Sequence, residues 1–341
     1  MKRYFILVFA LSLAFSCTKI TDKQIDTYLS GSGVFILNEG NFRWGNGSLS
    51  FYSYDSAKIY NDLFSNINER PLGDVPNSMA IFGDMAYILV NNSGKIEVVN
   101  KNTLLSQSTI NDLVSPRNMA IVTNSKAYVT SMYSDSIAII NLNNNTISGY
   151  INLRRTSESI IVNGSKAFIS NWVGGNEIMV VSIANDKVTD SILVGAEPES
   201  MVLDKNANLW VLCNGGWMRT TPAEINVINT STNKVVKELV FHDKQASPSC
   251  LNIDRIGETL YYLDGGVRQL NFNSETLPAS PLIAESGHYF YKLGINPSNS
   301  DIFVTDAADY QQKGFVYHYK NDGTLLSTLN ADIIPGLMCF K

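Results

Sequence analysis

Charged side chains are scarce in this chain of 341 residues: they make up 17% of it, whereas an ordinary soluble domain has about 25%. No run of Lys and Arg exceeds two residues, which excludes the clustered positive charge of nucleic-acid-binding proteins. No stretch of 18 apolar residues occurs either, so we expect no transmembrane helix. The 45% of hydrophobic residues nevertheless excludes a disordered chain.

The N-terminus has the pattern of an export signal. Lys2 and Arg3 precede an apolar run at 4–15, which is too short to span a bilayer and typical of a secretory signal peptide. The run ends in Ala-Phe-Ser-Cys at 14–17, which resembles a bacterial lipoprotein signal with Cys17 as the lipidated residue. We therefore predict a signal peptide over 1–17 and a flexible tether over 18–33. An ordinary signal peptide cut nearby is the alternative.

Cysteine is rare beyond Cys17, with only Cys213, Cys250 and Cys339 remaining. Their spacing matches no zinc pattern. We predict small structural residues that pack as free thiols; a disulfide or a reactive thiol is the alternative.

Polarity is supplied mainly by Asn, with 36 residues, and the chain also has 23 Gly. Both residues favour turns, and short strands joined by turns need many of them. One phrase recurs along the chain: a turn, often with Pro, a short apolar strand, and a second strand with an aromatic residue, as at 76–81 and 86–90. A third and a fourth strand follow, as at 96–100 and 146–151. Four strands per about 40 residues is the period of a β-propeller blade.

The two ends of the chain hold complementary halves of a blade. Residues 335–340 form a first strand with nothing after it, and 34–38 form a second strand with no first strand before it. The C-terminal strand should complete the N-terminal blade and close the ring. We predict an all-β, seven-bladed propeller over 34–341, with four antiparallel strands per blade. An open β-solenoid or two β-sandwiches would leave the half-blades unexplained. The seven first strands are anchored at Met79, Met119, Ile160, Met201, Leu251, Leu293 and Met338.

The segment Phe-Ile-Leu-Asn-Glu-Gly-Asn-Phe at 35–42, followed by Gly-Ser-Leu-Ser at 47–50, resembles the start of a known family. It is similar to the YncE-like, surface-layer-type seven-bladed propeller lipoproteins of Bacteroides and relatives. The resemblance covers 33–341 and includes the repeated Pro-x-Ser-Met phrase. Relatives of the BtuG type capture cobalamin at the cell surface and pass it to an outer-membrane transporter. The resemblance therefore implies a binding lipoprotein, with cobalamin as ligand and a transporter as partner.

A ligand site is expected on one face of the ring. The loops that enter the innermost strands and those that join second to third strands emerge together around the channel, where concave sites form. Three of the four Trp lie in these loops, whereas Trp210 falls on a strand and is expected in the core. Loop aromatics mark binding surfaces, although they also serve as plugs over blade ends. The entering loops further hold Asn77, Glu158, Glu197, Glu199, His288 and Tyr291.

Each second strand ends in a short polar residue, which would surround the funnel with hydrogen-bonding groups. Ordinary turn chemistry is the alternative. Arginines in these loops would meet carboxylate or phosphate groups of a ligand. The predicted ligand-binding residues are Asn38, Glu39, Phe42, Trp44, Asn91, Arg117, Tyr133, Arg154, Asn171, Trp172, Asn214, Trp217, Arg219, Asp264, Tyr289, Asp306 and Tyr310.

Three functions remain open at this point. The first is a non-enzymatic propeller that captures a large polar ligand with flat faces, such as cobalamin, and needs no cofactor. The second is a scaffold that binds glycan or protein. The third is a metal-dependent lactonase-type hydrolase, which would have to assemble Glu39, Asp264, Asp306 and His288. We expect a monomeric domain, attached by its lipid only, at the outer membrane or cell surface, with the periplasmic face as an alternative.

Overall fold

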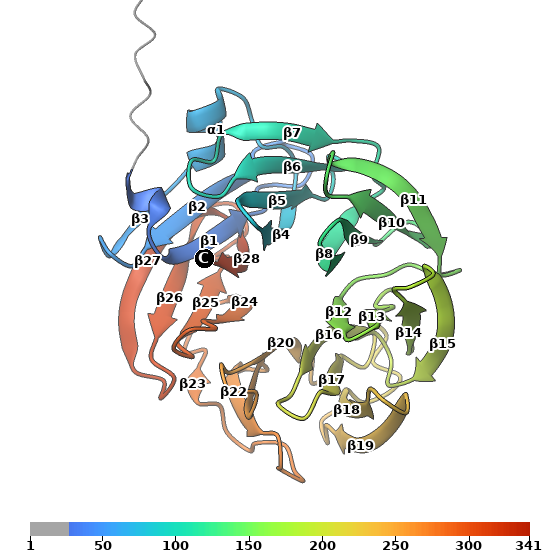
Figure 1. Cartoon of the computed structure of the whole chain (residues 1–341). Coiled ribbons are helices and arrows are strands. Elements are labelled where there is room, and N and C mark those ends of the chain that lie inside the picture. Colours follow the sequence, from blue (N-terminus) through green and yellow to red (C-terminus); the bar gives the residue numbers. More distant parts are fainter. Residues whose placement is uncertain (1–26) are drawn as a thin grey trace, which may run out of the picture.

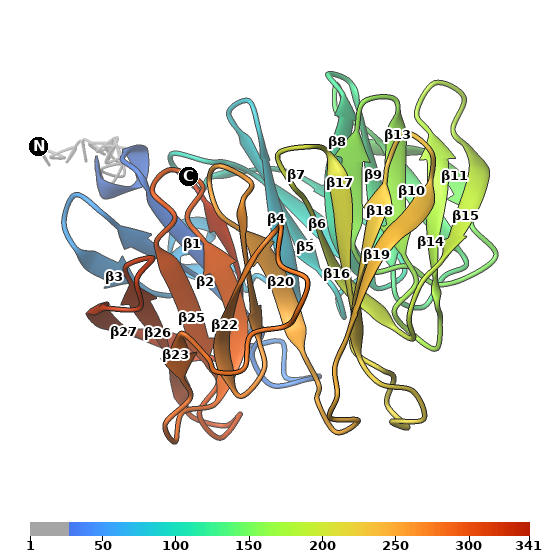
Figure 2. The same cartoon turned by 90° about the horizontal axis from the view of Figure 1, so that it is seen from below.

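The short strands predicted from the repeats form seven four-stranded antiparallel sheets in the computed structural model, which describes residues 27–341. The sheets follow one another around a closed ring (Figure 1). Seen from the side, the strands run between two faces that carry the loops (Figure 2). The predicted fold class is confirmed, including the number of blades and the four strands in each.

Every blade has its innermost strand at the channel and its outermost strand at the rim of the ring. From inside to outside, blade 1 contains β4 (Pro76–Phe82), β5 (Met85–Val90), β6 (Lys95–Asn100) and β7 (Ser106–Ile110). Blade 2 contains β8 (Pro116–Thr123), β9 (Lys126–Ser131), β10 (Ser136–Asn141) and β11 (Thr146–Asn152). Blade 3 contains β12 (Ile160–Asn163), β13 (Lys166–Ser170), β14 (Glu177–Ser182) and β15 (Lys187–Leu193).

The next three blades follow the same order. Blade 4 contains β16 (Pro198–Leu203), β17 (Asn208–Cys213), β18 (Glu224–Asn229) and β19 (Lys234–Val240). Blade 5 contains β20 (Ser249–Ile253), β21 (Thr259–Leu263), β22 (Gly266–Asn271) and β23 (Ile283–Ala284). Blade 6 contains β24 (Phe290–Ile295), β25 (Ile302–Asp306), β26 (Lys313–Tyr319) and β27 (Leu325–Ile333).

Blade 7 joins the two ends of the chain. It contains β28 (Pro335–Phe340), β1 (Gly33–Asn38), β2 (Ser48–Ser53) and β3 (Lys58–Tyr60). β28 pairs antiparallel with β1, with Val34 opposite Phe340 and Ile36 opposite Met338. The predicted closure by the C-terminal strand is therefore confirmed (Figure 1).

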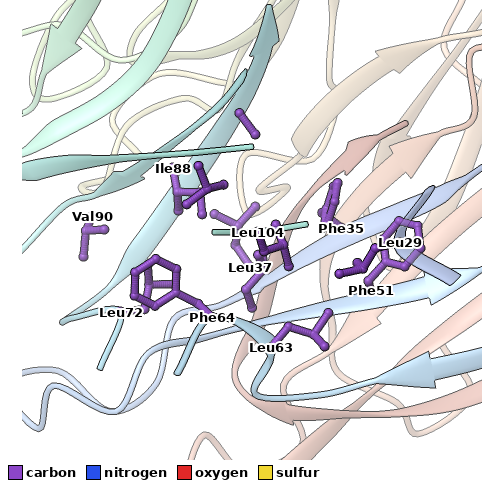
Figure 3. Close-up of a cluster of buried hydrophobic side chains, with 13 residues drawn as sticks. Leu29, Phe35, Leu37, Phe51, Leu63, Phe64, Leu72, Ile88, Val90 and Leu104 are labelled. Atoms are coloured by element: carbon purple, nitrogen blue, oxygen red, sulfur yellow. The ribbon is translucent and has the colours of Figure 1, made fainter. Parts of the chain in front are cut away.

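The core consists of seven apolar clusters, each between two neighbouring blades. Side chains alternate along β1, because successive residues of a strand point to opposite faces: Val34 and Ile36 pack against blade 6, and Phe35 and Leu37 against blade 1. Figure 3 shows the cluster between blades 7 and 1. Burial on both faces explains why these strands are continuously apolar. Trp210 lies in the cluster between blades 4 and 5, as predicted.

Residues 27–33, which were predicted to belong to the flexible tether, have a defined structure. Thr27–Ser30 form the 3-10 helix η1, in which Leu29 is buried in the cluster between blades 7 and 1 and Tyr28 stacks on Tyr60. The tether prediction is therefore corrected for 27–33, because Leu29 and Tyr28 pack on blade 7 and the Ser32 carbonyl accepts a hydrogen bond from the Tyr54 N–H. Cys17, the signal peptide and the rest of the tether lie outside the described residues.

Helices are minor in residues 27–341, where α1 (Leu63–Asn68) is the α-helix. None of the helices in this part of the chain is long and apolar enough to cross a membrane. The three cysteines are free, and Cys213 and Cys250 are buried, which agrees with structural thiols.

The excess of Asn has a repeated role in turns. Third strands end in Asn100, Asn141, Asn229 and Asn271, and each side-chain oxygen accepts a hydrogen bond from the backbone N–H two residues later. The hairpins that follow place Asn145 and Asn233 at positive φ, a conformation that Asn tolerates better than most residues. Asn therefore closes the same hairpin in several blades.

Glu97 is a fully buried carboxylate in blade 1. Its replacement should lower the free energy of unfolding by an amount that depends on pH. It accepts hydrogen bonds from Arg70 at 2.7 and 2.8 Å and from Lys95 at 2.6 Å. Burial opposes its ionisation, but Arg70 and Lys95 outweigh burial and lower its pKa. We expect Glu97→Gln to lower the free energy of unfolding by about 2–3 kcal/mol near neutral pH.

The unfolded chain, with the higher Glu97 pKa, binds more protons, so this stabilisation is full above the ordinary glutamate pKa. It disappears as the pH falls through the lowered pKa of folded Glu97. Urea unfolding at pH 7 and at pH 3 measures it. Glu275→Gln is the control, since Glu275 lies in an exposed ion pair with Lys237 and should cost less than about 1 kcal/mol. A pH-independent cost for Glu97→Gln would contradict this prediction.

Candidate functional site

All seven blades line a central cavity of about 450 Å³, six through their innermost strands and blade 3 through Glu158 and Ser159, which directly precede β12. In six of them the pairing with the second strand shifts by one residue near the start of the strand, directly after Pro in most blades. Such bulges turn a side chain away from the regular pleat and are common beside functional sites. Here they place polar residues at one mouth of the channel, including Asn77, Arg117, Glu199 and Tyr291.

Charges of both signs meet at this mouth, which we define by Glu39, Arg117, Glu158, Glu199, Tyr291 and Lys292. The Tyr291 hydroxyl donates to Glu39 Oε1 at 2.9 Å, and the backbone N–H of Cys250 donates to Glu199 Oε2 at 2.9 Å. The Lys292 ammonium lies over the ring of Tyr291, 5.0 Å from its centre. Burial alone would lower the pKa of Lys292, but the acidic groups around it, Cys250, Tyr291, Glu199 and Glu39, raise it. Lys292 is therefore a cation at neutral pH inside a mixed-charge cavity.

Arg117 and Glu158 form a two-pronged ion pair between blades 2 and 3, at 2.7 and 2.8 Å. Their side chains are only 13% and 12% exposed. Arg117 was predicted to meet a ligand's acidic group, but the protein supplies that group itself. Further bonds join neighbouring blades at this level, such as Asn77 Nδ2 to the Arg117 carbonyl at 2.7 Å.

Removal of one partner of this pair should lower the stability of the fold, because it leaves the other charge nearly buried and unpaired. We expect Glu158→Gln to lower the free energy of unfolding by about 3 kcal/mol. The double variant Arg117→Met with Glu158→Met should recover most of that loss, since an apolar pair removes the unmatched charge. Urea unfolding of wild type and of both variants measures these differences in the free energy of unfolding. If the double variant is less stable than Glu158→Gln, the bonds around the pair matter more than its charges.

We call the face that carries the entering loops and the loops between second and third strands the funnel face. Nine exposed large apolar side chains lie in its loops, whereas the opposite loops hold only Leu105 and Ile256 among the described residues. Where exposed apolar side chains form a contiguous patch, they mark a site for a partner or ligand. The nine are Phe42, Trp44, Val114, Tyr133, Val173, Trp217, Met218, Tyr289 and Tyr310.

Four of these aromatics, Phe42, Trp44, Tyr289 and Tyr310, lie on the neighbouring blades 6 and 7, and we call them the aromatic shelf. The Asn41 amide donates to the Tyr310 carbonyl at 2.9 Å and joins the two loops. The ring of Tyr310 meets the ring of Tyr291 edge-on, with 5.8 Å between their centres. Because Tyr291 is bonded to Glu39, the shelf continues into the channel mouth. A ligand with a flat apolar face and polar groups at its edge would find both kinds of contact here.

The ring of polar residues at the ends of the second strands is mostly committed to the protein itself. The Asn38 amide is fully buried and donates to Ser48 and Ser50. Most of the other members are bonded within their own loops or blades, as turn chemistry predicts, whereas the Asn91 amide donates to the Ser115 hydroxyl and the Pro116 carbonyl at the entry of blade 2. We therefore revise the predicted polar rim and leave these residues out of the site: Asn38, Asn91, Asn171, Asn214, Asp264 and Asp306.

Other predicted residues are also placed away from the shelf. Arg219 donates to the carbonyls of Asn214 and Ala246, so it holds a loop. Trp172 is half-buried and its indole nitrogen is enclosed, which agrees with the plug interpretation. Tyr133, Arg154 and Trp217 are exposed on the funnel face in blades 2 to 4.

The four residues proposed for a metal-dependent hydrolase are not brought together. His288 and Asp306 approach to 3.4 Å, and both contact the Tyr317 hydroxyl. Asp264 faces Arg268 in blade 5, and Glu39 is bonded to Tyr291. Within residues 27–341 no three His, Cys, Asp or Glu side chains lie close enough to share a metal ion.

Lys292 is the member of the channel mouth that the sequence reasoning missed. It lies one position beyond Tyr291, inside a segment interpreted only as a strand. Alignment of the repeats on their first-strand anchors, with Leu293 as the anchor here, would have placed it with Asn118, Ser159 and Ser200, which also line the cavity.

A family model described as "Domain of unknown function (DUF5074)" matches residues 32–334. Among solved structures, a quinonprotein alcohol dehydrogenase-like protein from Bacteroides thetaiotaomicron is similar, with a TM-score of 0.69 and 16% identity over 92% of this chain and 78% of that one. A functionally unknown protein from Desulfotomaculum acetoxidans has a TM-score of 0.71 and 14% identity, over 91% of this chain and 99% of that one. Hydrazine synthase from Kuenenia stuttgartiensis has a TM-score of 0.59 and 13% identity, over 75% and 86%. A search of curated proteins found no match. At these identities the structures show the fold alone.

Proposed function

This chain belongs to the DUF5074 family, a family of unknown function, and from that premise we propose that it is a non-catalytic binding protein of the cell envelope that captures cobalamin on its funnel face. The single observation that supports this most is the aromatic shelf running into the mixed-charge channel mouth. Large rigid aromatics beside a few polar groups are typical of ligand sites. The structural neighbours contribute the fold to this proposal, not the ligand.

The chemistry of cobalamin suits both halves of the site. Its corrin ring has broad, largely apolar faces that would lie against Phe42, Trp44, Tyr289 and Tyr310. The amide side chains at the edge of the ring could accept hydrogen bonds from the Lys292 ammonium and donate to the carboxylate oxygens of Glu39 and Glu199. The N-terminal strand resembles the YncE-like propeller lipoproteins, a family that includes cobalamin-capture members, and this supports the choice of ligand.

Calorimetric titration of the purified protein with cyanocobalamin tests the proposal. We expect binding with a Kd of about 1 μM or tighter, since the shelf and the mouth are already formed and little ordering is needed. Cobinamide, which lacks the nucleotide, should bind too, because the ring faces are the part recognised. Absence of binding to both compounds at micromolar protein would refute the proposed function.

We also propose that Cys17 carries a lipid that holds the protein at the outer membrane or cell surface, where it hands its ligand to a transporter. The support is the sequence at 14–17 and the family resemblance. Cys17→Ser should move the protein from the membrane fraction to the soluble fraction of fractionated cells. Retention in the membrane fraction would contradict the anchor.

A further inference from the structure

A groove on the funnel face lies between blades 3 and 4. These two blades lie across the ring from blades 6 and 7, which carry the aromatic shelf (Figure 1). Its volume is about 400 Å³. It is lined by the loops that follow β13 and β17 and by the loop that enters β16. The cobalamin proposal makes no use of this groove.

One wall of the groove is the indole of Trp217, which is 87% exposed. The loop that carries it is held in place. The Arg219 N–H donates to the Gly216 carbonyl at 3.1 Å, and its guanidinium donates to the Asn214 and Ala246 carbonyls at 2.8 and 3.1 Å. The ring is therefore presented on a fixed turn, which lowers the entropy lost when a ligand binds.

Four glycines line the groove. Two of them are closely packed, since a Cβ atom on Gly175 would clash with Asn171 and one on Gly215 would lie 2.8 Å from the Thr221 carbonyl oxygen, but the other two are open. A Cβ atom on Gly174 would meet nothing within 4 Å, and one on Gly216 would come no closer than 3.8 Å to its neighbours. A flat ligand can therefore approach the main chain closely. Glu197 bridges the two sides: its N–H donates to Gly175 at 2.6 Å and its carbonyl accepts from Asn214 at 3.2 Å. Its carboxylate is among the atoms nearest to that Gly216 position.

We propose that this groove binds a neutral saccharide, independently of cobalamin capture. The C–H face of a sugar ring packs on an exposed indole, and the ring hydroxyls donate to the Glu197 carboxylate and exchange hydrogen bonds with the Asn176 amide. The carboxylate makes an acidic sugar unfavourable, because like charges would be forced together.

Three trisaccharides test the proposal by calorimetry: chitotriose, maltotriose and tri-galacturonate. We expect at least one of the two neutral sugars to bind with a Kd of about 1 mM or lower, and tri-galacturonate to bind more weakly. Trp217→Ala should lower the affinity about tenfold or more, as loss of a central aromatic contact does. Trp44→Ala is the matched control, since Trp44 is 77% exposed on the same face but lies in blade 7. It should leave sugar binding unchanged.

Glu197→Gln removes the negative charge and keeps the size of the side chain, so it distinguishes the effect of charge from that of groove shape. The variant should discriminate less against tri-galacturonate than wild type does. Failure of both neutral sugars to bind overturns the proposal, and so does binding that survives Trp217→Ala. Cyanocobalamin titrated into Trp217→Ala keeps the two proposals apart, because that variant should bind it as wild type does.

Discussion

Removal of residues 335–341 is expected to abolish the cooperative unfolding transition of the whole propeller. These residues contain β28, the innermost strand of blade 7. Without it, the backbone groups of β1 that face β28 lose their partners, and the apolar clusters on both sides of blade 7 lose Met338, Cys339 and Phe340. The loss should approach the whole stability margin of a domain, about 5–15 kcal/mol. Circular dichroism during heating, together with gel filtration, measures it.

Two further measurements show whether the missing strand itself is responsible. A synthetic peptide of residues 335–341 added in trans should restore a folded, monomeric species, because an extended peptide can add to an exposed sheet edge. Phe340→Ala keeps the strand and removes one half-buried ring, so it should cost only about 2 kcal/mol. A truncated chain that melts like wild type would show that the ring does not depend on closure.

The double variant Trp44→Ala with Tyr310→Ala is expected to weaken cyanocobalamin binding by about 100-fold or more, since aromatic hot spots each contribute about 2 kcal/mol. Both side chains are exposed on the aromatic shelf, so the melting temperature should stay nearly unchanged. Calorimetric titration measures the affinity, and the thermal melt checks the fold.

Trp217→Ala supplies the control for this variant, because Trp217 is at least as exposed as Trp44 but lies in the loop after β17 in blade 4 rather than on the shelf. It should leave cobalamin affinity within about twofold of wild type, as peripheral side chains do. Equal losses from Trp217→Ala and from the double variant would place the ligand over the whole funnel rather than on the shelf.

Most of the fold could be predicted because the sequence patterns that specify its strands and turns are local and recur in each blade. Each strand is marked by a short apolar run, and each turn by Pro, Gly or Asn. Closure of the ring followed from the unmatched strands at 34–38 and 335–340. The 3-10 helix at 27–30 was harder to predict, because it depends on the burial of Leu29 and the stacking of Tyr28 on Tyr60, and no periodicity marks single contacts of that kind.

The candidate site was only partly predictable, for a different reason. Glu39 and the exposed shelf aromatics were found because their loops follow from the repeat. Asn38, one residue from Glu39, is fully buried because it is bonded to Ser48, Ser50 and the backbone of Asp332, a segment nearly 300 residues away in sequence. The bulge that turns Tyr291 towards Glu39 likewise depends on strand pairing. Residue type and spacing identify the right loops, but packing decides which side chains are free.

The pairing of Val34 with Phe340 also has a consequence for how the chain reaches its native state. β1 cannot pair with its inner partner β28 until β28 has been synthesised. By then the strands of the six other blades have been made, so blade 7 is the last to be completed. Contacts of such sequence separation slow folding, and the unpaired β1 exposes apolar side chains and an open strand edge. We therefore expect the late, rate-limiting step of folding to be the docking of β28, and the period before it to be the time at which this protein most needs protection from aggregation.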